Sequence, residues 1–366
     1  MTTTTRRTRT SRAAAAVVAV GLLPVLAACG NASAHGDASS ASAASGTVTL
    51  VTHDSWAVSK DVLAAFEKES GLTVKQVPMG DAGTLANQMV LTKDSPLGDV
   101  VFGIDNTFAS RVVDAGALEP YTPAGLSKSA HPYVVGNGAL TPIDLGDVCL
   151  NTDIAWFEKH GLSEPKTLED VAKPEYKNLL VAMNPASSSP GMAFLLATIG
   201  AFGDDGYGGK GWTGYWADLK ANGVKVSDSW EDAYYAEFSG AGQGGTRPIV
   251  VSYSTSPAYT VTKDGSSTTT RALLGTCFRQ VEYAGILNGA QNPAGAKKLI
   301  DFLVSQPFQA DIPGQMYMYP ADSSVELPAE WTTFAPLADQ PFAVSPADIT
   351  ANRDAWIEKW TTTVVG

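Results

Sequence analysis

The chain of 366 residues holds 37 acidic and 25 basic residues, which gives a formal net charge of −12. An acidic surface repels nucleic acid and anionic lipid and attracts cations, so the composition argues against a nucleic-acid-binding protein. Beyond the N-terminal segment, no stretch approaches about 18 continuous apolar residues, and we expect no membrane-spanning helix.

The first 28 residues have the pattern of a targeting segment. Their basic part holds Arg6, Arg7, Arg9 and Arg12, and residues 13–26 are apolar. Leu-Ala-Ala-Cys then ends at Cys29 and resembles a bacterial lipobox, in which signal peptidase cuts before the cysteine and lipid is attached to it. We therefore expect residues 1–28 to be a lipoprotein signal peptide, and Cys29 to anchor the exported protein on the outer face of the cytoplasmic membrane. A plain secretory signal followed by a chance cysteine is the alternative.

Residues 29–46 are mostly Ser, Ala, Gly, Asn and Asp, with no large apolar side chain. Such a segment cannot bury a core, and we predict a flexible tether. The chain from Thr47 onward, roughly 320 residues, is too long for one typical core and predicts two lobes. Without the four leader arginines, 37 acidic residues face 21 basic ones, a formal charge of −16.

Cys149 and Cys277 are the two cysteines left for the folded part. In the oxidising context of an exported protein, such a pair is typical of a disulfide. The closed loop would exceed about 100 residues, for which chain entropy predicts about 4 to 5 kcal/mol of stabilisation. Two buried free thiols are the alternative.

Strand and helix patterns alternate from Thr47 onward. Strands are predicted at residues 47–52, 72–78 and 99–104, and helices at residues 83–91 and 107–114. Between the first two strands, Val58, Val62 and Phe66 recur at helical spacing, and Gly71 is a typical helix end. This alternation predicts a largely parallel sheet flanked by helices.

A second α/β block follows the first. Thr167 and Asp170 have the spacing of a capping box, and Pro190 begins a helix that runs to about Phe202. Further strands are predicted at residues 179–183 and 249–253, a glycine-rich turn at 203–211, and helices at 214–221 and 293–305. With crossings near residues 141–147 and 277–283, the two blocks predict a clamshell. We assign residues 47–142 and 278–320 to the first lobe, and residues 143–277 and 321–366 to the second.

Motifs of catalysis are scarce. The sequence has no HExxH, GxSxG, P-loop or GxGxxG pattern, and its histidines, at positions 35, 53, 131 and 160, are too dispersed for a metal cluster. We therefore predict a binding protein rather than an enzyme, without catalytic residues, metal or cofactor.

Polar residues follow the first three predicted strands. His53, Asp54, Ser55 and Trp56 come after the first strand, Asp81 after the second, and Asp105 after the third. Ligands of open α/β sheets bind beyond the C-terminal ends of the strands, so these residues are candidates for a binding cleft. Helix capping is the more common use of Asp and Ser at single positions.

The second block offers a polar helix start and several aromatic residues. Ser187, Ser188 and Ser189 precede Pro190, where hydroxyls and free N–H groups suit an anion or simply cap the helix. Trp230 and Tyr234 lie four residues apart, and Tyr253, Ser254 and Tyr259 end or follow a strand. Aromatic faces in such turns can stack on a flat cationic ring, at roughly 0.5 to 2 kcal/mol each. Pairs at helical spacing are more often core.

The same segments resemble a known family. Residues 101–106, 188–191, 230–234, 251–259 and 351–360 are similar, in that order, to the thiamine-binding proteins of ABC importers, and residues 251–259 are the most specific part. The resemblance implies an α/β, two-lobed type II periplasmic-binding-protein fold, each lobe a mainly parallel sheet flanked by helices. It also implies thiamine or its mono- and diphosphate as the ligand and an ABC permease as the partner.

The resemblance assigns roles to individual residues. Asp81, Trp230, Tyr253 and Tyr259 would line the thiamine rings, with Ser188 and Ser254 toward the hydroxyethyl or phosphate end. Tyr317 falls where the family often has a tryptophan.

The chain also departs from the family pattern. His53, Leu145 and Asp147 stand where the family has tyrosines, so one more carboxylate could change which form of thiamine is preferred. Cys149 and Cys277 are additions beside the two crossings, where we expect a disulfide to brace the hinge.

The complete predicted ligand-binding set is His53, Asp54, Ser55, Trp56, Asp81, Asp105, Ser188, Ser189, Trp230, Tyr253, Ser254, Tyr259 and Tyr317. We expect a monomer that touches the membrane only through Cys29. The alternatives are a ferric-ion binder using Tyr234 and Tyr235, a polyamine binder, or a secreted thiamine-degrading enzyme with a cysteine nucleophile. A neutral His53 would stack on the ligand and a protonated one would repel a cation. Affinity should therefore fall as the pH drops through its pKa, about 6.5 if unperturbed.

Overall fold

The computed structural model describes residues 46–366, which belong to one compact unit. The predicted signal peptide, the lipidation site Cys29 and residues 29–45 of the predicted tether lie outside the described residues.

The described chain forms one ten-stranded sheet whose main path runs in the order β2-β1-β3-β9-β5-β8-β6-β7. Its strands are β1 (Gly46–Thr52), β2 (Leu72–Pro78), β3 (Val100–Asp105), β4 (Leu118–Glu119), β5 (Thr141–Asp153), β6 (Leu180–Met183), β7 (Lys225–Ser227), β8 (Ile249–Tyr253), β9 (Thr270–Leu287) and β10 (Tyr319–Pro320). The short strand β4 pairs with β9, and β10 pairs with β5.

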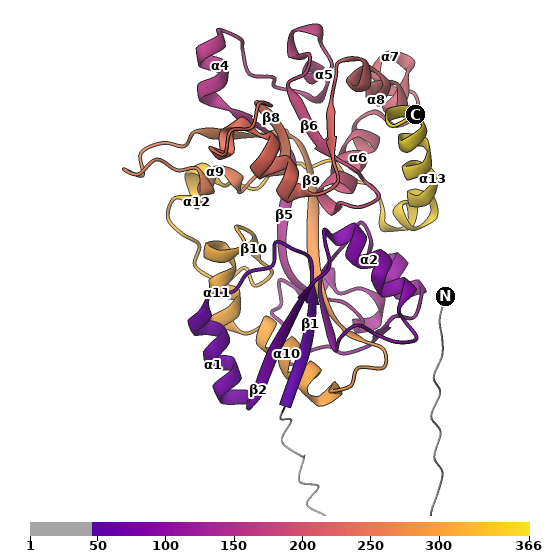
Figure 1. Ribbon diagram of the computed structural model, residues 1–366, viewed down its shortest axis with the longest axis vertical. Helices are drawn as coiled ribbons and strands as arrows, with labels where there is room; N and C mark the ends of the chain where they lie inside the picture. The colour runs from indigo at the N-terminus through magenta and orange to yellow at the C-terminus, as the bar shows by residue number, and fades with distance from the viewer. Residues whose placement is uncertain (1–45) are drawn as a thin grey trace, which may run out of the picture. The chain divides into compact units, whose positions relative to one another are not determined.

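Two parallel groups of strands flank the antiparallel middle of the sheet. In the first lobe, β1 pairs in parallel with both β2 and β3. In the second lobe, β6 pairs in parallel with both β7 and β8. The long strands β5 and β9 pair with each other and run along the middle of the molecule between the two groups (Figure 1). The two-lobed α/β fold expected from the sequence is thereby confirmed.

The lobes share a continuous sheet, whereas the sequence analysis expected a separate sheet in each lobe. The predicted crossings lie inside β5 and β9, and two register shifts interrupt the pairing of these strands. Such irregularities bend and twist a strand pair, which lets one pair of strands serve both lobes. The predicted lobe boundaries near residues 142 and 277 fall within these strands, and they stay a prediction.

Helices cover both faces of the sheet. In the first lobe they are α1 (Lys60–Ser70), α2 (Ala82–Leu91), α3 (Ala109–Asp114), α10 (Pro293–Leu303) and α11 (Gln306–Gln315). Successive residues of β1 point to opposite faces, so Leu50 packs in the core cluster under α1 and α10 while Val51 packs in the cluster under α2. The predicted helix end is confirmed, because Gly71 caps α1 with a left-handed φ of 71°.

The second lobe is built around the buried apolar helix α6 (Ser189–Phe202). Its helices are α4 (Ile154–His160), α5 (Leu168–Val171), α6 (Ser189–Phe202), α7 (Gly206–Gly209), α8 (Gly211–Ala221), α9 (Ser256–Tyr259), α12 (Trp331–Phe334) and α13 (Pro346–Val364). Its short turns are η3 (Pro174–Tyr176), η5 (Ser239–Ala241) and the π-helix η4 (Asp232–Glu237), whereas η1 (His131–Tyr133) and η2 (Gly136–Gly138) precede β5. Trp216 of α8 packs edge-on against Trp360 of α13, which fixes the C-terminal helix to this lobe. The predicted capping box of Thr167 and Asp170 is confirmed at α5.

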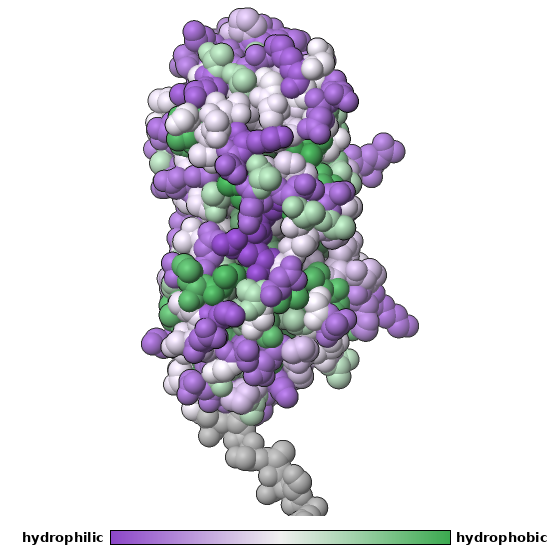
Figure 2. Space-filling model, turned by 90° about the vertical axis from the view of Figure 1, so that its right-hand side faces the viewer, coloured by the Kyte–Doolittle hydropathy of each residue, from purple (hydrophilic) through white to green (hydrophobic). Residues whose placement is uncertain are grey.

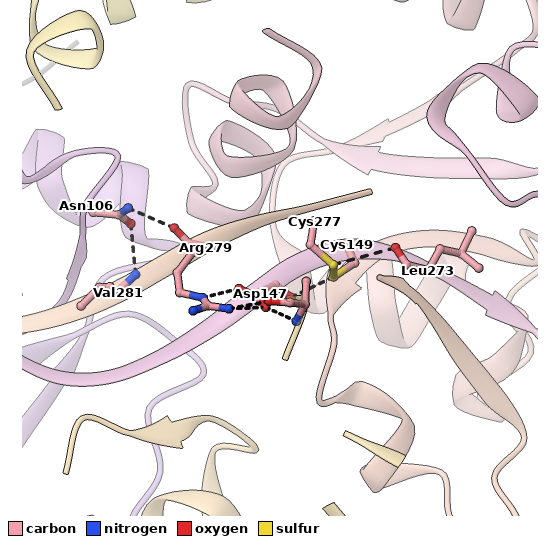
Figure 3. A network of polar contacts seen from close by, with 8 residues as sticks. Asn106, Asp147, Cys149, Leu273, Cys277, Arg279 and Val281 are labelled. Atoms are coloured by element: carbon pink, nitrogen blue, oxygen red, sulfur yellow. Dashed lines mark hydrogen bonds and ion pairs between the residues drawn. A yellow bond between two sulfur atoms is a disulfide. The ribbon is translucent and has the colours of Figure 1, made fainter. Parts of the chain in front are cut away.

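A covalent and ionic brace joins β5 to β9, and we use this name for Cys149, Cys277, Asp147 and Arg279 (Figure 3). Cys149 and Cys277 form a disulfide with a Cα–Cα distance of 4.2 Å, as predicted. The fully buried carboxylate of Asp147 accepts two hydrogen bonds from Arg279, at 2.6 and 2.9 Å, and one from the amide of Ala338 at 2.6 Å. Arg279 neutralises this carboxylate, and Asp147 is not among the residues that line the cavity between the two lobes; its expected influence on ligand choice stays a prediction.

The face shown in Figure 2 is mostly hydrophilic, with apolar residues in scattered patches. None of the described helices has the length and apolar character needed to cross a membrane.

Candidate functional site

A cavity of about 350 Å³ opens between the two lobes. The first lobe contributes the segment after β1, the start of α2 and Glu282 of β9, and the second lobe contributes the starts of α6 and η4 and the turn after β8. The lining residues are His53, Asp54, Ser55, Trp56, Ala57, Asp81, Ala82, Ser189, Pro190, Trp230, Glu231, Tyr234, Tyr235, Tyr253, Thr255, Ser256, Tyr259, Glu282, Gln315, Met316, Tyr317 and Met318.

The second lobe supplies most of an aromatic wall. Trp230 stacks on Tyr234 with ring centroids 5.0 Å apart, and it meets Tyr253 edge-on at 6.2 Å. Tyr259 in turn meets Tyr317 edge-on at 5.3 Å. Tyr317 has a φ of 55°, a left-handed conformation that is uncommon for a bulky residue and that clusters at functional sites. The wall therefore presents several ring faces and edges to whatever occupies the cavity.

The π-helix η4 arranges part of this wall. Its wider turn is shown by the amide of Phe238, which donates to the carbonyl of Ala233, five residues back. Single π-helical turns are frequently found at functional sites. The wider turn brings Tyr235 to the cavity together with Trp230 and Tyr234. Ordinary helical spacing predicts that only Trp230 and Tyr234 share a face of the helix.

Asp81 joins the two lobes at the cavity edge. As the N-cap of α2 it accepts a hydrogen bond from Ala82, and its second oxygen accepts one from the amide of Trp230 in the other lobe, at 2.9 Å. Burial raises the pKa of Asp81, and the hydrogen bonds from these two amides oppose that rise.

Two further contacts bring the lobes together. The amide of Thr84 donates to the carbonyl of Ser187 at 3.0 Å, and Ser55 donates to Glu231 at 3.2 Å. Gly83 allows this approach, because a Cβ there would lie 2.7 Å from the carbonyl carbon of Ser187. The lobes are thus in direct contact beside the cavity.

His53 lies at the inner end of the cavity against Glu282. Its Nε2 is 3.5 Å from the Glu282 carboxylate, and its Nδ1 accepts a hydrogen bond from the amide of Ser55 at 3.1 Å. Because Nδ1 accepts, the ring in this arrangement is neutral and carries its proton on Nε2. Burial is the largest single influence and lowers the pKa of His53, but Glu282, Asp81 and Asp54 together raise it more, so the net shift is upward.

Gly103 makes room for this imidazole. The residue has a φ of 99° at a register shift between β3 and β9, and a Cβ on it would overlap the His53 ring. The glycine within strand β3 therefore serves the close approach of a cavity side chain.

Most of the predicted binding residues do line the cavity. These are His53, Asp54, Ser55, Trp56, Asp81, Ser189, Trp230, Tyr253, Tyr259 and Tyr317. They come from both lobes and lie far apart in the sequence, as a site between two lobes requires.

Three predicted residues lie behind the cavity wall instead. Asp105 is fully buried and accepts hydrogen bonds from the backbone and hydroxyl of Thr107. Ser188 is the N-cap of α6 and accepts from the amide of Gly191, and its side chain also interacts with the carboxylate of Asp81 at the cavity edge. Ser254 is buried and donates its amide to the carbonyl of Asp147.

Several lining residues were absent from the predicted set. They are Ala57, Ala82, Pro190, Glu231, Tyr234, Tyr235, Thr255, Ser256, Glu282, Gln315, Met316 and Met318. Glu282 had a usable signal, since a charged residue inside an apolar strand is costly to bury without a partner or a purpose. Met316 and Met318 flank a predicted residue but carry no polar signal of their own.

Comparison with known proteins places this chain in a family. Residues 61–338 match the family described as bacterial extracellular solute-binding protein. The thiamine-binding periplasmic protein of Salmonella typhimurium is 28% identical over 320 residues, covering 86% of this chain and 92% of that protein. The protein of the same name from Haemophilus influenzae is 24% identical, covering 87% and 92%.

Solved structures agree with this placement. A periplasmic thiamin binding protein has a TM-score of 0.75 at 26% identity, over 87% of this chain and 96% of that one. Iron-bound HitA from Pseudomonas aeruginosa has a TM-score of 0.66 at 19% identity, over 86% and 99%, and shares the fold. The match over most of the described residues shows that this chain belongs to the family of bacterial extracellular solute-binding proteins.

Proposed function

We propose that this chain captures thiamine in the cavity between its lobes and delivers it to an ABC importer. One observation carries the proposal: aromatic rings enclose a cavity whose charged lining groups are the carboxylates Asp54, Asp81, Glu231 and Glu282, together with His53. The described lining residues include no lysine or arginine. Such a cavity suits a flat cation.

The chemistry of thiamine matches each of these features. Its thiazolium ring is a permanent cation, and each aromatic face that it meets contributes roughly 0.5 to 2 kcal/mol. Its aminopyrimidine ring is flat and offers groups for hydrogen bonds to carboxylates. The cavity is within the usual size range of small-molecule sites, about 300 to 1,000 Å³. The names of the relatives support the same ligand.

The proposal extends to the cellular role of the chain. We propose a lipoprotein anchored through Cys29, acting as a monomer at the outer face of the cytoplasmic membrane, with the mono- and diphosphates of thiamine as further ligands. It would act by binding, without a catalytic step or a resident cofactor. The family and the names of its periplasmic relatives support export.

Two of the alternatives, the ferric-ion binder and the thiamine-degrading enzyme, fit the cavity less well. Hard-metal sites want converging oxygen ligands, often ionised ones, yet burial raises the pKa of both Tyr234 and Tyr235. Within residues 46–366, no group of three or more His, Cys, Asp or Glu side chains could hold a metal ion. Cys149 and Cys277 are bonded to each other and buried, so neither offers a nucleophile to the cavity.

Calorimetry with a panel of ligands tests the proposal. The panel is thiamine, its mono- and diphosphate, spermidine and ferric citrate. We expect saturable heat with thiamine and none with ferric citrate. Absence of heat with every form of thiamine, together with tight binding of another ligand, would disprove the function.

A pair of tryptophan variants tests the site. Trp230→Ala removes a cavity ring and should weaken thiamine binding at least tenfold, about 1.4 kcal/mol, with little change in the melting temperature of the ligand-free protein. Trp156→Ala on α4 is the matched control, since Trp156 stacks on His160 outside the cavity. Equal affinity of the two variants would remove Trp230 from the site.

A further inference from the structure

Glu282 reaches the cavity from the centre of a buried row of carboxylates, the acidic row, formed by Asp105, Glu282 and Asp144. In the sheet, Glu282 of β9 is directly opposite Asp105 of β3 on one side and Asp144 of β5 on the other. Side chains of directly opposite residues share one face of a sheet, with Cβ atoms about 4.5 to 5.5 Å apart. Asp105 and Asp144 are fully buried, and Glu282 is 5% exposed.

Few donors or cations compensate this row. Neither carboxylate oxygen of Asp144 has a hydrogen-bond partner, and one oxygen of Asp105 has none. Glu282 accepts a hydrogen bond from the amide of the Gln280 side chain at 3.1 Å. A proton on Asp144 would supply a missing donor and hydrogen-bond Glu282.

The groups that face Glu282 come from every element packed around it. They are His53 after β1, Asp105 of β3, Asp144 of β5, Tyr253 of β8 and Gln280 of β9, and Asp81 at the start of α2 acts on both His53 and Tyr253. His53 is the one basic group of this set. Arg279 lies near Glu282 in the sequence, but its guanidinium is hydrogen-bonded to Asp147 of the brace.

We propose that Glu282 is the counter-ion of the ligand's positive charge, and that the acidic row gives up a proton when the cation binds. This inference rests on the proposed capture of thiamine. Three neighbouring carboxylates in a buried site cannot all ionise, because like charges disfavour each other and burial disfavours charge. The empty site therefore retains a proton near neutral pH. A thiazolium bound beside Glu282 compensates the negative charge of the row in place of that proton. The proton is released to the solvent, so one positive charge replaces another.

The titration of the flanking residues agrees with this geometry. The pKa of Asp105 is raised to about 7, chiefly by burial and also by the charge of Glu282, against the hydrogen bonds from Thr107 and Phe108. Burial also raises the pKa of Asp144 well above its ordinary value, with a second contribution from Glu282. Protons are thus available for exchange at the pH of the cell envelope.

Calorimetry in buffers of different ionisation enthalpy measures the exchange. At pH 7 we expect the observed heat of thiamine binding to vary with the buffer in proportion to about one released proton, and affinity to rise up to tenfold per pH unit. 3-Deazathiamine, a neutral isostere with thiophene in place of thiazolium, should release no proton. Thiamine binding that is independent of the buffer would overturn the inference and leave the proposed function intact. No binding of any form of thiamine would overturn the proposed function itself.

Two variants test whether the released proton comes from the acidic row or from His53. Asp144→Asn should still bind thiamine but release fewer protons, whereas His53→Gln should keep most of the release. The reverse result would make His53 the proton source and overturn the role of the row. Asp147→Asn is the matched control, because it removes a buried carboxylate of the same strand that is paired with Arg279, and its proton release should equal that of the unchanged chain.

Infrared difference spectra of the unchanged chain provide a test that needs no variant. On thiamine binding, the carbonyl band of protonated carboxylic acids should decrease while the carboxylate band increases. Unchanged carboxylic bands in a thiamine-saturated sample would contradict the exchange even if every variant failed to fold.

Discussion

Asp144 and Asp147 are buried carboxylates three residues apart on β5, and their surroundings are opposite in kind. Asp147 lies across from Arg279 of β9, which binds both of its oxygens. Asp144 lies across from Glu282, and neither of its oxygens has a hydrogen-bond partner. An odd spacing puts the two side chains on opposite faces of the strand. The cross-strand partner therefore decides whether the same residue type stabilises the fold or serves the site.

The two faces of the β5–β9 strand pair carry different groups. One face carries the brace, with its disulfide and ion pair. The other carries the acidic row and Gly146, whose absent Cβ leaves room for the ring of Tyr253. Burial and like-charge repulsion disfavour ionised carboxylates of the acidic row, so their cost must be offset elsewhere in the fold. We infer that the brace offsets the cost of the acidic row.

Removal of the disulfide should have the largest effect on stability. The bond closes a segment with a sequence separation of 128 residues, and chain entropy then predicts a loss of about 5 kcal/mol in the double variant Cys149→Ala/Cys277→Ala. The free energy of unfolding from denaturant titration measures this loss. A double variant as stable as the unchanged chain would mean that other contacts of the two strands make the disulfide redundant.

Arg279→Ala should be nearly as damaging, because it leaves Asp147 buried and unpaired. Breaking a buried ion pair typically costs about 3 to 5 kcal/mol. Arg271→Ala is a matched control on the same strand, since Arg271 is more exposed and makes one 3.3 Å contact with Glu164. The Arg271→Ala variant should lose less than about 1 kcal/mol of unfolding free energy. Similar melting temperatures for the two variants would show that Asp147 does not depend on Arg279.

The sequence predicts the elements of this molecule better than it predicts their partners. Alternating patterns and glycine or proline signals locate β2 and β8 to the residue, because local hydrophobic periodicity determines strands of this kind. Polar and aromatic residues at the ends of predicted strands are likewise visible in the local sequence, and they predict much of the cavity lining. Glu282 had a local signal as a buried charged residue of a strand, but its pairing with Asp144 could not be predicted, since it depends on which strands become neighbours across the sheet. The π-helical turn that brings Tyr235 to the cavity likewise has no clear local signal.

Asp144→Asn should stabilise the ligand-free protein at high pH. Because burial raises the pKa of Asp144, the folded state holds a proton that the unfolded state loses above about pH 4. The associated stability is complete below the unfolded pKa and is lost as the pH rises through the folded pKa, by up to about 1.4 kcal/mol per pH unit. The variant should therefore exceed the unchanged chain by a margin that grows from pH 5 to pH 8. A variant that is less stable at pH 8 would show that Asp144 has a stabilising partner.

His53→Gln should change the pH dependence of binding and little else, the smallest effect expected. Because Glu282 raises the pKa of His53 above its ordinary value, the imidazole becomes protonated at a higher pH than a free histidine. The protonated ring repels a cationic ligand and forms a charged pair with Glu282, so thiamine affinity should fall as the pH drops through this raised pKa. It should fall less steeply in the glutamine variant, and the two proteins should bind alike at pH 8. Parallel affinity profiles from pH 5 to pH 8 would remove His53 from the pH dependence and assign it to the carboxylates of the site, which are the acidic row and Asp81, because His53 is the one basic group beside Glu282.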